Sequence, residues 1–266
     1  MMEGVGRIAG AVSSHLGYVR PVNQDNFILQ RQVNEESGPV LELSPDLTPE
    51  LGDWYCFGVF DGMGGGEQGE VASWLAAKEF QSLSADRKLR RGEIDLLVRD
   101  TFRAANRAIL EQHNDRMYGT TGTVVFTDAN YFKIYHLGDS RCYLLRLGGI
   151  FRLTRDHTLA ALKLSAGGYD GDTAQLERDR HVLTEYIGSD PGSRDLKPDE
   201  TPWLTLMPED RLLLCTDGLH NLVEEGEMRE YLGKYAEPLE CAWKLTELAL
   251  TRGGTDNITT LVAARE

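Results

Sequence analysis

Apolar and β-branched residues gather in short runs bounded by turn residues, a pattern typical of β-strands. Ala, Leu and Phe recur at three-to-four spacing in longer segments, which predicts helices over residues 69–83, 94–113 and 239–250. The two kinds of pattern are mixed along the chain without strict alternation. The strands predicted from the short runs cover residues 54–60, 120–127, 131–137, 142–147, 211–215 and 258–263.

The stretch 119–153 reads as consecutive strands joined by short turns at 128–130 and 147–149. Short turns of this kind connect antiparallel neighbours, so hairpins are predicted rather than crossover units. Sheets covered by helices, an α+β architecture, follow. Segments 30–52 and 160–200 resist assignment, and we interpret both as loops or partly ordered excursions from one domain spanning residues 1–266.

Charge and composition narrow the class of protein. The chain has 28 Lys+Arg against 42 Asp+Glu, a formal net charge of -14, which disfavours nucleic acid and anionic membranes as partners. The four cysteines form no Cys-x-x-Cys pair, and we interpret them as reduced, buried thiols. Residues 1–20 lack the run of about 20 apolar residues that spans a membrane, so we expect a cytoplasmic protein without a signal peptide.

Aspartates stand where predicted strands end. Asp61, Asp139 and Asp217 each follow an apolar run, and Asp256 lies in a turn just before the last strand. Any one Asp-Gly pair is explained by an ordinary turn, but the set is harder to dismiss. Converging carboxylates repel one another unless cations neutralise them. Hard oxygen donors without His or Cys indicate Mg²⁺ or Mn²⁺, and Gly62 lets its own backbone carbonyl approach an ion.

These residues belong to motifs that resemble the metal-dependent protein phosphatases, the PPM or type 2C class, in their bacterial form. Residues 17–27 match the opening motif, and further blocks follow in the family's order across positions 17–262. An ordered series of this kind is far more specific than a lone glycine-rich turn. Among the matching blocks are DGMGG at 61–65, GTT at 119–121, GDSR at 138–141, LTRDH at 153–157, CTDGL at 215–219 and DNIT at 256–259.

The resemblance implies a fold and an activity. The fold would be two antiparallel β-sheets packed as a sandwich flanked by helices on both sides, with metal at one edge. The activity would be hydrolysis of phosphoserine and phosphothreonine in proteins by a metal-activated water, reversing a cognate serine/threonine kinase. Residues 160–200 would form a flap near the site whose exposed residues select substrates.

The resemblance also implies the metal ligands. Asp61 would bridge two Mn²⁺ or Mg²⁺ ions, and the Gly62 carbonyl would bind one of them. Asp217 and Asp256 would complete the ligand set, while Asp25 would order metal-bound water.

Two further roles come from the same resemblance. Asp139 together with Asp217 corresponds to a weaker third metal position. Arg20 corresponds to the family's phosphate-binding arginine, and its fork of N–H donors suits phosphate oxygens. Arg20, Asp61 and Asp217 are thus the expected catalytic residues.

Departures from the family pattern leave a second hypothesis open. Gln24 stands where Glu is frequent, Met63 where eukaryotic relatives carry a histidine proposed as general acid, and Gly66 where many bacterial members have histidine. The leaving-group proton would then come from metal-bound water or another group. The alternative is a catalytically weak phosphatase-like module that binds a phosphoprotein or regulatory partner.

Other chemistries find less support. A cysteine phosphatase needs Arg five residues after its Cys, and Cys215 is followed there by His220. A nuclease would require a basic groove. The acidic stretch 170–177 lacks the ligands and glycine of a calcium loop. The six histidines are interpreted as packing or surface residues, with His157 stabilising a turn.

Overall fold

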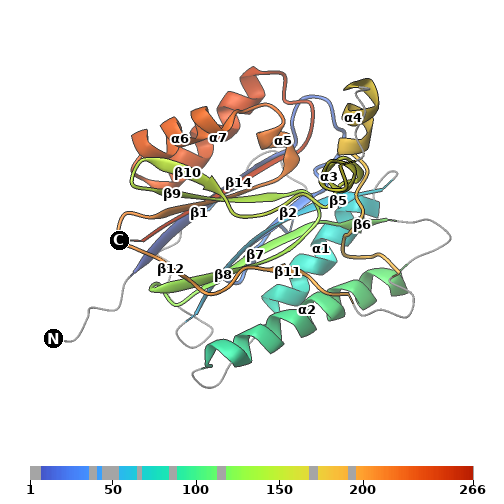
Figure 1. Ribbon diagram of the computed structural model, residues 1–266, viewed down its shortest axis with the longest axis horizontal. Helices are drawn as coiled ribbons and strands as arrows, with labels where there is room; N and C mark the ends of the chain where they lie inside the picture. The colour runs from blue at the N-terminus through green and yellow to red at the C-terminus, as the bar shows by residue number, and fades with distance from the viewer. Residues whose placement is uncertain are drawn as a thin grey trace.

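Two antiparallel β-sheets lie face to face, and helices cover both outer faces of this sandwich (Figure 1). The computed structural model describes residues 7–35, 41–43, 54–64, 68–83, 89–112, 118–167, 173–190 and 196–265. The predicted α+β class and the sandwich architecture are confirmed.

The first sheet joins the two ends of the described chain. Its strand order is β10-β9-β13-β14-β1-β4, and β1 pairs with β14 along its whole length. The strands are β1 (Ile8–His15), β4 (Leu41–Leu43), β9 (Arg141–Arg146), β10 (Gly149–Arg152), β13 (Arg211–Cys215) and β14 (Ile258–Arg265).

The second sheet is built around the hairpin-connected strands that the sequence predicted. Its order is β11-β8-β7-β5-β2-β3, with two short strands off this path, β12 beside β8 and β6 beside β5. The strands are β2 (Asp25–Leu29), β3 (Gln32–Val33), β5 (Tyr55–Met63), β6 (Gly119–Thr120), β7 (Gly122–Thr127), β8 (Tyr131–Leu137), β11 (Asp199–Glu200) and β12 (Leu204–Thr205).

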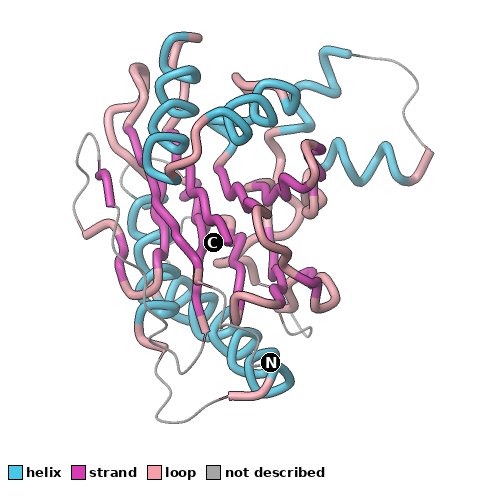
Figure 2. The backbone as a smooth tube through the Cα atoms, turned by 90° about the vertical axis from the view of Figure 1, so that its left-hand side faces the viewer, coloured by secondary structure: helices cyan, strands magenta, loops and turns pink. Residues whose placement is uncertain are grey.

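Continuous apolar runs arise because the central strands are buried on both faces. In β13, Leu212 and Leu214 point into the core between the sheets, while Leu213 and Cys215 contact the helices outside. Helices α1 (Gln68–Gln81) and α2 (Arg91–Glu111) cover the second sheet; α5 (Asp217–His220), α6 (Glu225–Lys234) and α7 (Pro238–Thr251) cover the first (Figure 2).

The prediction that residues 160–200 form loops is wrong in part. This segment contains most of α3 (Leu159–Ser165), all of α4 (Thr173–Arg180), and β11. Both helices are short, and α4 carries almost no apolar residues, so neither produces the periodic pattern that identifies a helix. They pack together at one end of the sandwich (Figure 1).

Other expectations have mixed outcomes. Most of segment 30–52 and residues 170–172 lie outside the described residues. All four cysteines are buried and unpaired, as predicted. Within the ranges given above, no helix has the length and apolar character needed to cross a bilayer. Every described strand belongs to one of the two sheets, and the assignment of residues 1–266 to one domain stays a prediction.

Candidate active site

Aspartates from distant parts of the chain meet at one edge of the sandwich. Asp61 lies near the end of β5, directly opposite Asp25 at the start of β2. Asp217 opens α5 just after β13, Asp256 precedes β14, and Asp139 lies in the turn between β8 and β9. Four of these side chains, all but that of Asp25, line one cavity of about 210 Å³, which we call the acid-lined cavity.

Asp61 is the centre of this group. Its N–H donates to Thr121 Oγ1 (2.9 Å), and its carbonyl accepts from the Thr121 N–H (2.9 Å) and the Thr120 hydroxyl (2.9 Å). Burial, followed by the charges of the other aspartates, raises the pKa of Asp61 well above its usual range. Its backbone is thus fixed where its charge is unfavourable without a nearby cation.

Asp25 lies beneath the cavity and is only 2% exposed. Its Oδ2 accepts hydrogen bonds from the Thr216 and Thr259 hydroxyls, both at 2.8 Å, whereas its buried Oδ1 has no partner. Burial raises the pKa of Asp25 to about 8. An unsatisfied buried carboxylate oxygen is costly, so this atom suits a water molecule or a proton beside the cavity.

Asp139 and Asp217 form the opposite wall. Burial, and then the charge of Asp217, raises the pKa of Asp139 to about 8. Burial and the charge of Asp256 likewise raise the pKa of Asp217, against the opposing contributions of Arg20 and His181. The pKa values of four carboxyl groups in this cluster are thus raised, which favours their neutral forms. This is expected of a cluster that lacks compensating positive charge. The four are Asp25, Asp61, Asp139 and Asp217.

Arg20 supplies positive charge at the rim. Its Nε and Nη2 donate to the two carboxylate oxygens of Asp256 at 2.8 and 2.7 Å, a bidentate pair. The Asn257 side chain joins the loop that precedes β14 to the loop that carries Arg20. It donates to the carbonyls of Leu16 (2.8 Å) and Val22 (3.0 Å), and accepts from the Gln24 N–H (2.8 Å). The loop that carries Arg20 is thereby fixed beside Asp256.

Two glycines allow backbone segments to approach closely at this edge. A Cβ on Gly62 would lie 2.1 Å from the Gly69 carbonyl oxygen, and one on Gly218 would lie 1.9 Å from the carbonyl oxygen of Asn257. Neither space accepts a side chain. The glycine after Asp61 and the glycine after Asp217 therefore allow the end of β5 and the start of α5 to pack closely against neighbouring backbone.

The donor set fits a hard divalent cation. The cavity offers carboxylate oxygens and the Gly62 backbone, and the neighbouring Asp25 oxygen is unsatisfied. Within the described ranges, no three His, Cys, Asp or Glu side chains already form a cage around one point. The predicted ligand roles of Asp61, Gly62, Asp217, Asp256 and Asp139 stay predictions, as do those of Asp25 and Arg20.

Sequence reasoning underrated His181. This exposed residue follows α4 and lines the acid-lined cavity together with Met63 and Gln24. It carries no sequence signal of its own, because it reaches the site only through the folding of segment 160–200. His157 does stabilise a turn as predicted, since its Nδ1 accepts from the Gly138 N–H at 3.2 Å. Gly65 and Gly66 lie outside the described residues.

Comparison with known proteins identifies the family. Residues 18–163 match the family described as protein phosphatase 2C. The serine/threonine phosphatase stp of Listeria monocytogenes is 32% identical over 242 residues, covering 89% of this chain and 92% of that protein. The serine/threonine protein phosphatase PstP of Mycobacterium tuberculosis is 34% identical over 210 residues, covering 76% of this chain but 39% of PstP, so this chain corresponds to about two fifths of that relative.

Solved structures agree. The catalytic domain of PstP, determined with two manganese ions, superposes with a TM-score of 0.73 at 29% identity, covering 97% of this chain and 99% of that one. Matched motifs, full-length similarity to stp and the shared sandwich lead to one conclusion: this chain belongs to the protein phosphatase 2C family, whose named relatives here are serine/threonine protein phosphatases.

Proposed function

We propose that this protein hydrolyses phosphoserine and phosphothreonine in protein substrates, with water as the nucleophile and two Mn²⁺ or Mg²⁺ ions as cofactors. The observation that carries the proposal is the convergence of Asp61, Asp139, Asp217 and Asp256, from four separate elements, on one cavity with an arginine at its rim. A module that only binds phosphoproteins has no use for carboxylates held together against their own repulsion.

The roles of the carboxylates follow from their positions. Asp61, Asp217, Asp256 and the Gly62 carbonyl are the groups that would hold the ions. Bound divalent cations supply the charge that makes hydroxide available from water near neutral pH. Asp25 keeps one oxygen fixed by two threonine hydroxyls and leaves the other to orient a water.

Arg20 is the proposed ligand of the substrate phosphate. Its guanidinium donates two hydrogen bonds to the two oxygens of the Asp256 carboxylate, and a phosphate presents a similar pair of oxygens. Because Asp256 and phosphate compete for the same N–H donors, Arg20 becomes available when Asp256 has another cationic partner. The guanidinium then stabilises negative charge on the phosphate oxygens.

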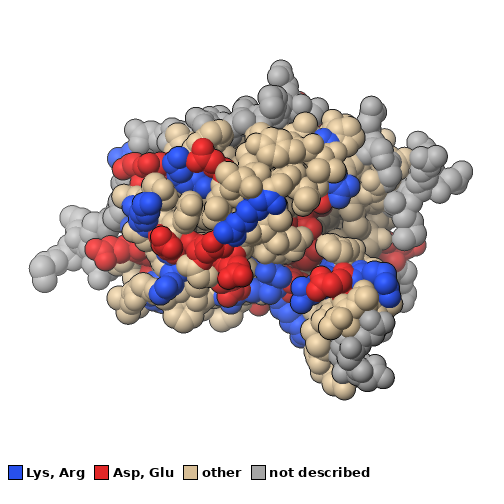
Figure 3. Space-filling view, turned by 90° about the horizontal axis from the view of Figure 1, so that it is seen from above, with Lys and Arg blue, Asp and Glu red and all other residues tan. Residues whose placement is uncertain are grey.

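Finer assignments are also proposals. Asp139 with Asp217 would hold a third, weaker ion, because the two acidic side chains face one cavity wall. A cognate serine/threonine kinase would supply the substrates. The four buried, unpaired cysteines suit a reducing cytoplasm. On the face shown in Figure 3, basic and acidic side chains are intermixed, which does not suit a phosphodiester backbone.

The test is hydrolysis of a phosphothreonine peptide in EDTA, Mn²⁺ and Mg²⁺, combined with anomalous scattering from Mn²⁺-soaked crystals. We expect turnover that requires metal, and anomalous peaks among Asp61, Asp217 and Asp256. Peptide binding without turnover at several pH values, with metal bound, would establish the binding module instead. An empty cavity at saturating Mn²⁺ would overturn the metal assignment.

A further inference from the structure

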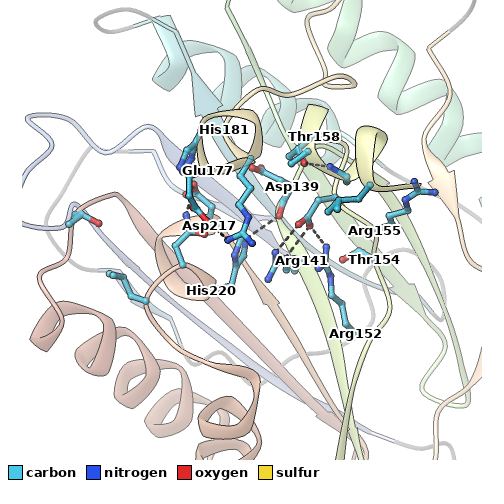
Figure 4. A pocket seen from close by; sticks show the side chains of 18 residues that line it. Asp139, Arg141, Arg152, Thr154, Arg155, Thr158, Glu177, His181, Asp217 and His220 are labelled. Carbon is cyan, nitrogen blue, oxygen red and sulfur yellow. Dashed lines mark hydrogen bonds and ion pairs between the residues drawn. The ribbon is translucent and has the colours of Figure 1, made fainter. Parts of the chain in front are cut away.

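A second and larger cavity opens beside the acid-lined one. It measures about 820 Å³ and shares Asp139, His181 and Asp217 with its neighbour, so the two cavities adjoin. Figure 4 looks into it: Asp217 and His181 lie toward one side, Arg152 and Arg155 toward the other. We call it the arginine-lined cavity because of the four arginines in its wall, Arg141, Arg152, Arg155 and Arg180.

Two of these arginines share a single carboxylate. Arg141 donates to both oxygens of Asp156, at 3.1 and 2.7 Å, and Arg152 donates to one of the same oxygens. Burial alone would raise the pKa of Asp156, but the two guanidinium groups outweigh it and hold that pKa below its usual value. Two guanidinium groups thus share one carboxylate, and the buried Arg152 Nε has no hydrogen-bond partner among the described residues.

The other two arginines are available to a ligand. The Arg155 side chain is exposed and forms no ion pair or hydrogen bond with the described residues, although its backbone carbonyl accepts a hydrogen bond from His136 Nε2 (3.0 Å). Among the described residues, Arg180, at the end of α4, pairs only with Glu177, and both side chains are about 60% exposed (59% and 61%). Such an exposed pair contributes little and exchanges easily for a better partner.

The location of these charges sets the class of ligand. In a chain with a net charge of -14, four arginines line a cavity beside the proposed phosphate site, and two of them, Arg155 and Arg180, are exposed. When Arg20 binds the phosphate of a phosphopeptide, the residues next to the phosphorylated residue lie close to this region, because the two cavities share one wall. A volume of about 820 Å³ accommodates several side chains.

We propose that the arginine-lined cavity binds an anionic side chain of the substrate, within a few residues of the phosphorylated serine or threonine, and so selects substrates with acidic neighbours. The proposal rests on the phosphatase activity proposed above. A carboxylate and a second phosphate share the recognised chemistry, an oxygen pair matched to a guanidinium fork.

The experiment compares phosphothreonine peptides of one sequence that carry Glu, phosphoserine, Ala or Lys at each position within three residues of the phosphothreonine. We expect the wild-type enzyme with Mn²⁺ to show kcat/KM about tenfold higher for an anionic than for an alanine neighbour at one or more positions. Preference for both anions shows that a carboxylate suffices; preference for phosphoserine alone identifies a second phosphate as the ligand.

Variants locate the effect. Arg155→Ala combined with Arg180→Ala should reduce the preference to within about twofold, while hydrolysis of p-nitrophenyl phosphate stays unchanged. The charge-reversed pair, Arg155→Glu with Arg180→Glu, should favour Lys neighbours. Arg178→Ala is the matched control. Arg178 belongs to the same helix, but its side chain donates to Gln175 and does not line the cavity.

The outcomes separate the two proposals. Equal kcat/KM for all neighbours, with p-nitrophenyl phosphate hydrolysed normally, overturns the inference and leaves the phosphatase activity standing. A preference that survives in both double variants overturns it as well. Absence of metal-dependent hydrolysis of every substrate would instead refute the proposed function.

Discussion

The acid-lined and arginine-lined cavities share a wall yet differ in how their charges are balanced. In the first, one buried and several half-buried aspartates lie together, and the pKa values of Asp25, Asp61, Asp139 and Asp217 are raised. In the second, carboxylates and guanidiniums pair, and the pKa of Asp156 is lowered. The protein thus balances its own charge in the cavity suited to recognition, and leaves it unbalanced in the cavity suited to cations.

The elements behind the two cavities differ too. Strand ends and the tight turns after them present the aspartates, so their positions are set by the sandwich core. The arginine-lined cavity takes residues from β9, β10, the segment after β10 and the small helices α3 and α4, and it shares Asp217 of α5 with the first cavity. We therefore expect substitutions in the first region to affect chemistry or folding, and substitutions in the second to affect substrate choice.

Asp217→Asn should have the largest effect on activity. The amide keeps the shape of the side chain and loses the charge, so kcat/KM with Mn²⁺ should fall at least about 100-fold. Because mutual repulsion is relieved, the melting temperature of the metal-free protein should rise. Glu177→Gln, a carboxylate change in the arginine-lined cavity, is the control and should leave p-nitrophenyl phosphate hydrolysis intact. Normal activity and manganese dependence in Asp217→Asn would contradict the assignment.

Gly218→Ala tests the rigidity of the short helix α5, which begins with Asp217. Its Cβ would lie 1.9 Å from the Asn257 carbonyl oxygen, so backbone must move, at a cost of about 2 to 3 kcal/mol in the free energy of unfolding. Urea denaturation measures this loss. Gly226→Ala in α6 is matched to it: nothing lies within 4 Å, and a helical alanine should slightly stabilise the protein. Equal stability of the two variants would show that α5 shifts to accommodate the added methyl group without loss of stability.

The sequence predicted one of these cavities far better than the other. Strands such as β13 were predictable because their apolar runs are buried on both faces and bounded by turn residues. Asp61, Asp139 and Asp217 could be found because they stand where those runs end, and the family resemblance added Arg20 and Asp25.

The arginine-lined cavity had no such signal. Helix α4 is almost entirely polar, so periodicity did not predict it.

The long-range contacts of the acid-lined cavity could not be predicted either. The Arg20–Asp256 pair joins positions 236 residues apart, and the hydrogen bonds of Asn257 also depend on how distant loops meet. Local sequence pattern does not determine such contacts, since the whole chain must fold before they form.

Arg20→Ala should raise KM for a phosphopeptide about tenfold, because a charge-assisted fork to phosphate is lost. It should also strengthen Mn²⁺ binding, because Asp256 loses the cation that now occupies it. Steady-state kinetics and manganese titration measure the two effects separately. Arg20→Lys keeps the charge without the fork and should recover only part of the affinity. A loss confined to metal binding would contradict the phosphate role.

The pH dependence of stability should also distinguish the two cavities. Asp25 and Asp139 have pKa values near 8 in the folded, metal-free protein and about 3.9 when unfolded. The folded state therefore binds more protons between these limits, and stability falls as pH rises toward 8. The melting temperature of the metal-free protein should therefore drop by several degrees or more between pH 6 and pH 8.

The paired carboxylate of the second cavity predicts the opposite sign. The pKa of Asp156 is lowered, so its contribution is complete above the unfolded value and is lost only as pH falls through the folded one, well below this range. Adding Mn²⁺ should abolish the drop between pH 6 and 8, because ion binding requires the deprotonated carboxylates and tightens as they ionise. A pH-independent melting temperature without metal would mean that the acid-lined cavity already balances its charge, and the contrast between the two cavities would fail.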